Sequence, residues 1–237
     1  LPNENTTDWL VQSRLMLGDS YARLERWEEA QSAFRSIAQS KADDATREQA
    51  AFQYAKLTYR SAGPFGDAIP IFNQFLRDFP RTEYRREANE YLANLYLTSR
   101  DYGRAIEAIV QTGMGSSAMR EAYQKVAYFR GVELYQSSQW DKANELMDQS
   151  LSYPLDRGYT ALAHFWKGEM AYRQGNFREA LDQTEKFLKV PGSFNLSERP
   201  AAQYNKAYAL YRLDRLEDAA ASFRVFLEDA SAGDRRR

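Results

Sequence analysis

The chain has 237 residues, no cysteine and a formal net charge of -1, from 32 lysines and arginines against 33 aspartates and glutamates. The lack of cysteine excludes disulfides and thiolate metal sites but leaves the compartment open. A balanced charge gives no overall field to attract a phosphate backbone, so we expect no nucleic-acid partner. No stretch approaches the roughly 18 consecutive apolar residues of a membrane span, so we expect no membrane insertion of this segment.

A unit of two helices recurs along the chain. It is first seen in residues 17–34, with Leu17-Gly18, Tyr21, Ala30 and Phe34 in the spacing L-G-x-x-Y followed by A-x-x-x-F. The alanine of this unit returns at intervals of 37 to 39 residues, at Ala30, Ala68, Ala105, Ala143, Ala180 and Ala219. The recurrence predicts a single all-α array over residues 1–237, with repeats at about 7–42, 43–80, 81–115, 116–154, 155–192 and 193–230.

Small residues mark the first helix of each unit, at Gly18, Ala93, Gly131, Gly168 and Ala207, with Lys56 as the exception. The second helix carries a larger residue four positions after its alanine, at Phe34, Phe72, Ile109, Met147, Thr184 and Phe223. Only Thr184 breaks the apolar rule. The pattern predicts close packing, because a glycine or alanine on the first helix lets the second helix approach.

Helix start and stop signals follow the same order along the chain. Residues 5–8, Asn-Thr-Thr-Asp, offer N-cap oxygens before Trp9, so we expect the first helix to begin there. Pro70 is compatible with a helix only within its first turn, where the amide has no intrahelical acceptor. Residues 112–117, rich in glycine and serine, indicate a connector. Residues 231–233, Ser-Ala-Gly, indicate that the last helix stops there.

The two-helix unit resembles the tetratricopeptide repeat (TPR) family over nearly all of residues 8–229. The resemblance implies an α-solenoid of about six helix hairpins in a right-handed superhelix with a concave groove that binds protein segments. A HEAT or armadillo array is the alternative fold, although those repeats run longer and lack the L-G-x-x-Y signature. The join at residues 75–84, Phe-Leu-Arg-Asp-Phe-Pro-Arg-Thr-Glu-Tyr, is similar to joins in TPR proteins of the bacterial cell envelope.

No enzyme signature emerges from the sequence. His164 is the only histidine, so a Cys-His pair is impossible, and a Ser-His-Asp or metal site would depend on this one imidazole. It lies four residues before Gly168, on the predicted packing face, so we interpret it as a hydrogen-bonded structural residue. We therefore expect no catalytic residue, no metal site and no cofactor.

A second stripe on the first helices of the last three repeats is the candidate binding feature. Its members are spaced i, i+4, i+7 and are Tyr128, Val132 and Tyr135; Phe165, Glu169 and Tyr172; and Tyr204, Tyr208 and Tyr211. Arg173 and Arg212 follow two of the stripes directly. The stripe is turned by about 100 degrees from the packing face, which in TPR proteins is the direction of the concave surface. The alternative is that the rings pack between repeats.

The leading hypothesis is a scaffold that holds a peptide or partner protein segment through Tyr128, Tyr135, Phe165, Tyr172, Arg173, Tyr204, Tyr208, Tyr211 and Arg212. The alternatives are a structural spacer or assembly module, and an accessory region of an enzyme whose catalysis lies elsewhere in the parent chain. The resemblance implies a periplasmic or cell-envelope location, with the cytoplasm as the alternative.

The ends of the sequence suggest a fragment of a longer chain. It starts without a methionine, and the apolar Phe223, Phe226 and Leu227 have no following repeat to cover them. We therefore expect the array to continue beyond Arg237.

Overall fold

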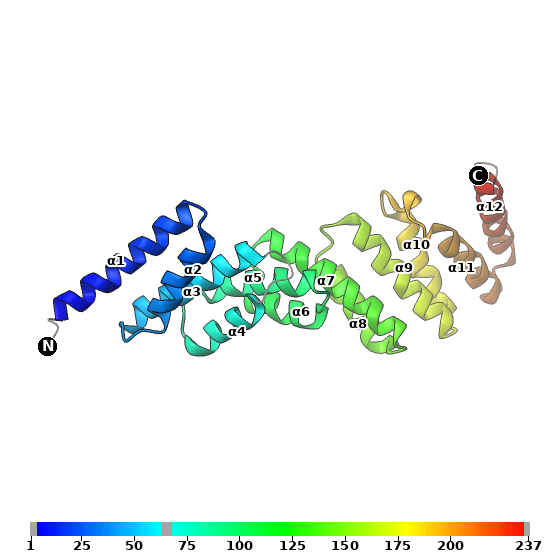
Figure 1. Ribbon diagram of the computed structural model, residues 1–237. Helices are drawn as coiled ribbons and strands as arrows, with labels where there is room; N and C mark the ends of the chain where they lie inside the picture. The colour runs from blue at the N-terminus through cyan, green and yellow to red at the C-terminus, as the bar shows by residue number, and fades with distance from the viewer. Residues whose placement is uncertain (1–3, 63–67, 235–237) are drawn as a thin grey trace. The chain divides into compact units, whose positions relative to one another are not determined.

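The computed structural model describes residues 4–62 and 68–234, and in these ranges the chain forms twelve α-helices, one short 3-10 helix and no strand (Figure 1). This confirms the prediction of an all-α fold built from helix hairpins. The helices are α1 (Glu4–Arg23), α2 (Trp27–Ala38), α3 (Asp44–Ala62), α4 (Ala68–Asp78), α5 (Arg85–Thr98), α6 (Tyr102–Gln111), α7 (Ser117–Gln136), α8 (Trp140–Leu151), α9 (Arg157–Arg173), α10 (Phe177–Lys189), α11 (Arg199–Arg212) and α12 (Leu216–Asp234), with the 3-10 helix η2 (Ser193–Asn195) between α10 and α11.

The chain divides into two compact units, residues 1–114 and 115–237. The division falls inside the connector predicted at residues 112–117, where Gly113 and Met114 have positive φ angles of 76° and 48°. The first unit contains α1 to α6 and the second contains α7 to α12. The prediction of one continuous array over residues 1–237 stays a prediction.

Within each unit a helix packs mainly against the helices next to it in sequence. In the second unit the first helices of consecutive hairpins also touch, α7 with α9 and α9 with α11. The cores accordingly form local clusters, one around Phe34 and Ile37, another around Met147 and Met170. Stability therefore depends on contacts between neighbouring repeats, as in other helical repeat arrays.

The small residues of the first helices pack against side chains of the second helices. A methyl group built on Gly18 would lie 2.9 Å from the ring of Phe34, and one built on Gly131 would lie 2.7 Å from the end of Met147. At Gly168 the same position meets the hydroxyl of Thr184 at 3.0 Å. The prediction that small residues permit close helix approach is confirmed at these three positions.

The turn inside the hairpins repeats one backbone geometry. A residue seven positions after the small residue has a positive φ angle in five hairpins, at Glu25, Arg100, Ser138, Gly175 and Asp214. The following amide donates back across the turn, as from Arg26 to the carbonyl of Tyr21 at 2.9 Å. These are Schellman caps, which satisfy the last carbonyls of each first helix. Only Gly175 adopts the left-handed conformation without steric cost.

Two predicted helix ends were wrong. Helix α1 begins at Glu4, so residues 5–8 lie within the helix and not before its start. Helix α12 runs to Asp234, through the predicted stop at residues 231–233. Serine and a single glycine each weaken a helix by about 1 kcal/mol or less relative to alanine, which is too little to end it. Pro70 lies in the first turn of α4, as expected.

A buried glutamine joins the fourth hairpin to the fifth. Gln124 of α7 has no exposed surface, and its amide nitrogen donates to the carbonyl of Asp156 at 2.9 Å and to the Thr160 hydroxyl at 3.0 Å. Its amide oxygen accepts from the backbone N–H groups of Leu155 and Asp156, at 3.1 and 2.7 Å. The side chain thereby fixes the connector from which α9 starts.

Within the described ranges, no helix is both long and apolar enough to cross a membrane.

Candidate partner-binding surface

Two members of the aromatic stripe belong to the core. Tyr128 is 8% exposed, and its hydroxyl accepts a 3.2 Å hydrogen bond from the indole N–H of Trp166 on α9. Burial raises the pKa of Tyr128. Phe165 is also buried, with its ring 5.8 Å from that of Phe187. The prediction that these two rings contact a ligand is therefore corrected, because the next hairpin or the partner helix already covers them.

Tyr135 and Tyr172 are half-buried and link consecutive first helices. The ring of Tyr135 lies 4.7 Å from Trp166, and that of Tyr172 lies 5.5 Å from Tyr208 on α11. Burial is the main reason that the pKa values of both tyrosines are raised above the usual 10. Their hydroxyls therefore stay neutral at physiological pH and can donate or accept hydrogen bonds.

The stripe becomes accessible on α11. Tyr204 is 41% exposed and Tyr211 is 56% exposed, while Tyr208 between them is half-buried. The ring of Tyr208 stands 6.2 Å from Tyr204 and 6.3 Å from Tyr211, and 6.1 Å from Phe177 on α10. Packing by Phe177 and Tyr172 holds the central ring in place, so the exposed rings beside it need little further ordering on binding.

The two arginines beside the stripe have different surroundings. Arg173 is paired with Glu169 through a 2.7 Å contact, and Glu169 also accepts from the amide of Asn205 at 2.8 Å. Arg212 instead lies with its guanidinium carbon 4.4 Å from the centre of the Phe177 ring and donates a long 3.4 Å hydrogen bond to Tyr208. Arg212 is therefore the better placed of the two to meet an acidic or carbonyl group of a partner.

We call the accessible part of the stripe the tyrosine surface, comprising Tyr172, Arg173, Tyr204, Tyr208, Tyr211 and Arg212. It combines large rigid rings, phenolic hydroxyls and a guanidinium on α9 and α11. Tyrosine and arginine are enriched at protein interfaces because they supply contact area together with hydrogen bonds. The arrangement suits recognition of a protein segment and provides no nucleophile activated by a neighbouring base.

His164 is engaged in the packing of the fifth hairpin. Its Nδ1 lies 2.7 Å from the amide oxygen of Gln183 on α10, so Nδ1 carries the proton. The amide nitrogen of Gln183 in turn donates to Glu179 at 2.9 Å. In the part of the chain that the structure describes, no group of three His, Asp or Glu side chains could hold a metal ion.

Acidification should destabilise the chain through His164. Its pKa is lowered mainly by burial, with smaller contributions from Lys186 and Lys167, while the bond to Gln183 and the charge of Asp182 oppose the shift. The unfolded chain therefore binds more protons, and stability falls as the pH drops through the unfolded value of 6.5. Thermal unfolding at about pH 7.5 and about pH 5.5 should show a smaller acid-induced loss in His164→Gln than in the unchanged chain. An equal loss in both would contradict this origin.

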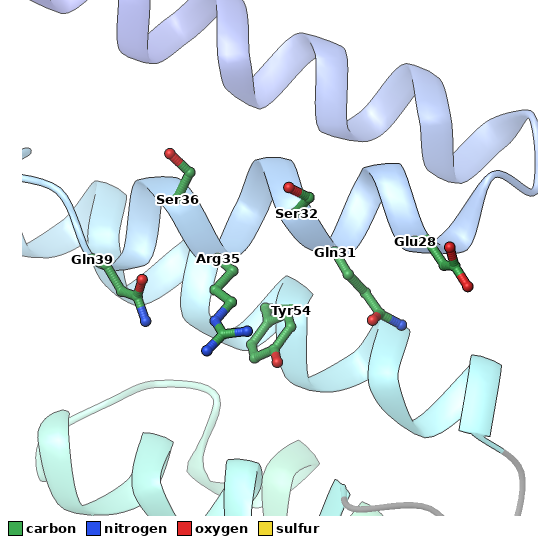
Figure 2. Close-up of a pocket in the computed structure, with 7 residues that line it drawn as sticks. All are labelled: Glu28, Gln31, Ser32, Arg35, Ser36, Gln39 and Tyr54. Atoms are coloured by element: carbon green, nitrogen blue, oxygen red, sulfur yellow. The ribbon is translucent and has the colours of Figure 1, made fainter.

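A separate polar hollow of about 470 Å³ lies along α2 and α3, and sequence reasoning did not indicate it (Figure 2). The Arg35 guanidinium is 6.0 Å from the ring of Tyr54, and Gln31 donates to Ser61 at 2.6 Å. A smaller hollow of about 270 Å³ adjoins it and reaches Phe75. The only feature of the sequence that could have indicated this hollow is the i, i+4 spacing of polar residues on α2. Such spacing is also typical of a solvated helix face.

All of the protein-family models that match this chain describe the same type of repeat. One tetratricopeptide repeat model matches residues 57–113, 130–189 and 171–235, and a second matches residues 12–40. No curated protein matched the sequence significantly.

Three solved structures illustrate the similarities found, all at low identity. MamA AMB-1 is 17% identical with a TM-score of 0.45, over 77% of this chain and 92% of that chain. A tetratricopeptide repeat protein from Parabacteroides merdae ATCC 43184 is 12% identical with a TM-score of 0.44, over 92% and 79%. The TPR2AB domain of yeast Sti1, solved as a complex with pHSP90, is 15% identical with a TM-score of 0.40, over 96% and 93%.

Proposed function

The chain belongs to the tetratricopeptide repeat family, a family of protein–protein interaction modules, and from that premise we propose that it binds an extended or helical segment of a partner protein on the tyrosine surface. The bound segment lies along α9 and α11, in the groove that first helices line in this family. Tyr208 and Tyr211 supply the apolar contact, and Arg212 orients an acidic or carbonyl group of the segment. The family consists typically of non-enzymatic scaffolds.

The exposure of Tyr211 and Tyr204 beside the packed Tyr208 carries this proposal. Exposed tyrosines next to a fixed aromatic cluster offer binding area at a low entropic cost, since each side chain has few rotatable bonds. A neighbouring guanidinium adds direction to the contact because it presents its donors in a fixed plane.

Selection from a display library of unstructured peptides tests the proposal. Peptides that bind the unchanged chain should bind Tyr208→Ala roughly 30-fold more weakly, which corresponds to about 2 kcal/mol for a central anchor. Arg212→Glu should weaken acidic peptides most. Phe194→Ala is the matched control, because Phe194 on η2 is 68% exposed but lies outside the tyrosine surface. Failure to enrich any peptide, or equal binding by all variants, would refute the proposal.

Thermal unfolding of the same variants separates binding from folding. Because Tyr208 is half-buried, Tyr208→Ala should lower stability modestly, whereas Arg212→Glu should leave it nearly unchanged. If Tyr208→Ala unfolds as readily as a core variant, its weaker binding is caused by unfolding. The binding of Arg212→Glu, which stays folded, then decides whether the tyrosine surface binds the peptide.

A structural spacer or assembly module is the second candidate. The burial of Tyr128 and Phe165 favours it, since there the stripe holds repeats together. A location in the bacterial cell envelope is also a proposal, supported by the likeness of the join at residues 75–84 alone.

A further inference from the structure

The smaller hollow, of about 270 Å³, lies between the first two hairpins. Its apolar lining includes Ala51 of α3 and Ile71, Phe75 and Phe79 of α4. Phe75 is 3% exposed, and the centre of its ring lies 5.3 Å from that of Phe52 and 5.5 Å from that of Phe79, so this lining is firmly packed. Three consecutive helices, α2, α3 and α4, line the hollow. It therefore lies inside the first unit and not on the outer face of a terminal hairpin.

A cation lines this hollow at a position where other hairpins carry an acid. Five residues after the repeat alanine, the fourth and fifth hairpins have Asp148 and Glu185. Each of these acids pairs with a lysine of the next first helix. Asp148 pairs with Lys167, and Glu185 pairs with Lys206 at 3.7 Å. In the first hairpin the same position holds Arg35, so the sign of the charge is reversed there.

Arg35 differs from those acids in its surroundings. The place of the two lysines is taken in α3 by Ala55, which has no exposed surface. Within residues 4–62 and 68–234, Arg35 forms no ion pair, and its guanidinium carbon lies 6.0 Å from the centre of the Tyr54 ring. The side chain is exposed. Its guanidinium is therefore available to a carboxylate that another molecule supplies.

The two other charged residues that line this hollow already have partners. Arg47 pairs with Asp44 at 3.1 Å. Asp78, on the α4 side, accepts a hydrogen bond from the amide of Gln74 at 2.6 Å. A carboxylate from outside is attracted by Arg35 and repelled by Asp78, so it binds on the α2 side of the hollow.

The volume of the hollow suits one large side chain better than a whole small molecule, since sites for small ligands measure roughly 300 to 1,000 Å³. The polar hollow of about 470 Å³ along α2 adjoins it, and the two share Arg35, Gln39 and Tyr54. Figure 2 shows Gln31, Arg35 and Gln39 extending from α2 toward the side on which Tyr54 lies. The side-chain amides of Gln31 and Gln39 can bond to the main chain of an extended segment, because each amide both donates and accepts.

We propose that this hollow binds a protein segment that carries an acidic residue close to a large apolar one. The apolar side chain fills the hollow against Ile71 and Phe75, and the carboxylate pairs with Arg35. The ring of Tyr54 restricts the guanidinium before binding, which lowers the entropic cost of forming the pair. All of these residues lie in the first unit, and none belongs to the tyrosine surface, so the inference is independent of the proposed function.

Peptide display on a chain whose tyrosine surface is disabled tests this proposal. The target is the 237-residue chain with Tyr211→Ala and Arg212→Glu, two changes in the second unit. A library of unstructured peptides serves as the probe. The peptides that it enriches should share an aspartate or glutamate close to a phenylalanine, leucine or tryptophan.

Two further substitutions in the target locate the bound peptide. Arg35→Glu should weaken binding of the selected peptides by roughly 30-fold or more, and it should restore binding when lysine replaces the acid of the peptide. Ala51→Leu fills the hollow and should weaken the same peptides by a similar factor. Arg14→Glu is the matched control and should leave binding unchanged, because Arg14 is an exposed arginine of α1 that does not line the hollow.

Thermal unfolding confirms that each variant folds, and if Ala51→Leu does not, the charge exchange at the exposed Arg35 decides. Enrichment of peptides that lack an acidic residue would overturn the proposal. The same holds for an empty selection, and for peptides whose binding survives both Arg35→Glu and Ala51→Leu. A failure here leaves the proposed function standing, because Tyr208→Ala and Arg212→Glu test that function in the second unit.

Discussion

Replacing Gln124 with leucine should destabilise the second unit by about 2 to 4 kcal/mol, the largest effect we expect of a single near-isosteric change. The leucine fills a similar volume but cannot accept from the N–H groups of Leu155 and Asp156, nor donate to Thr160. Each backbone donor left without an acceptor costs about 1 to 3 kcal/mol if water cannot reach it. Urea unfolding followed by circular dichroism measures the loss.

Gln136→Leu is the matched control for this change. Gln136 is an exposed residue at the C-terminal end of the same helix, α7, so the same substitution there should change stability by about 0.5 kcal/mol or less. Equal stability of the two variants would show that water replaces the amide of Gln124 and that the glutamine does not fix the connector.

Gly168→Leu should destabilise the fifth hairpin by about 1 to 3 kcal/mol through overpacking. The first added carbon already meets the Thr184 hydroxyl at 3.0 Å, and the backbone of Thr184 and Ala180 lies directly behind it, at 3.5 and 3.6 Å. A leucine side chain could be accommodated only if α9 and α10 moved apart. Ala180→Leu, on the facing helix and with no exposed surface, should have an effect of the same kind.

Gly168→Ala separates overpacking from the loss of glycine itself. Alanine favours the helix by about 1 kcal/mol relative to glycine, which offsets the tight contact with Thr184, so its net effect should be small. Thermal unfolding of both variants decides the matter. If Gly168→Leu is as stable as Gly168→Ala, close approach of α9 and α10 at this glycine is not required.

The hairpins were predictable because their determinants are local in sequence. The L-G-x-x-Y and A-x-x-x-F spacing puts a small residue on the first helix opposite a larger one on the second, and this pairing recurs between Gly18 and Phe34 and between Gly131 and Met147. Helix ends were less predictable. Residues 5–8 resemble a helix cap, and residues 231–233 resemble a helix stop. They nevertheless lie inside α1 and α12, because their polar residues and glycine weaken a helix only slightly.

The candidate site was predictable only in part, because exposure depends on what lies beside a repeat. Tyr128 and Tyr204 occupy the same position in their repeats, and nothing in their local sequence separates them. The structure buries Tyr128 under α9 and leaves Tyr204 open. Gln124 and Gln136 also differ in exposure, since only Gln124 contacts the start of the next hairpin.

The sequence by itself therefore determined the repeat, the helix pairs and the close-packed small residues, all of which depend on side chains within about 40 residues of one another. The tertiary structure decided which aromatic rings are core and which are surface, that Arg173 is paired while Arg212 lies on Phe177, and that Gln124 anchors a connector. These properties arise from contacts between hairpins. Such contacts bury one face of each repeat and leave open the faces that no neighbour covers.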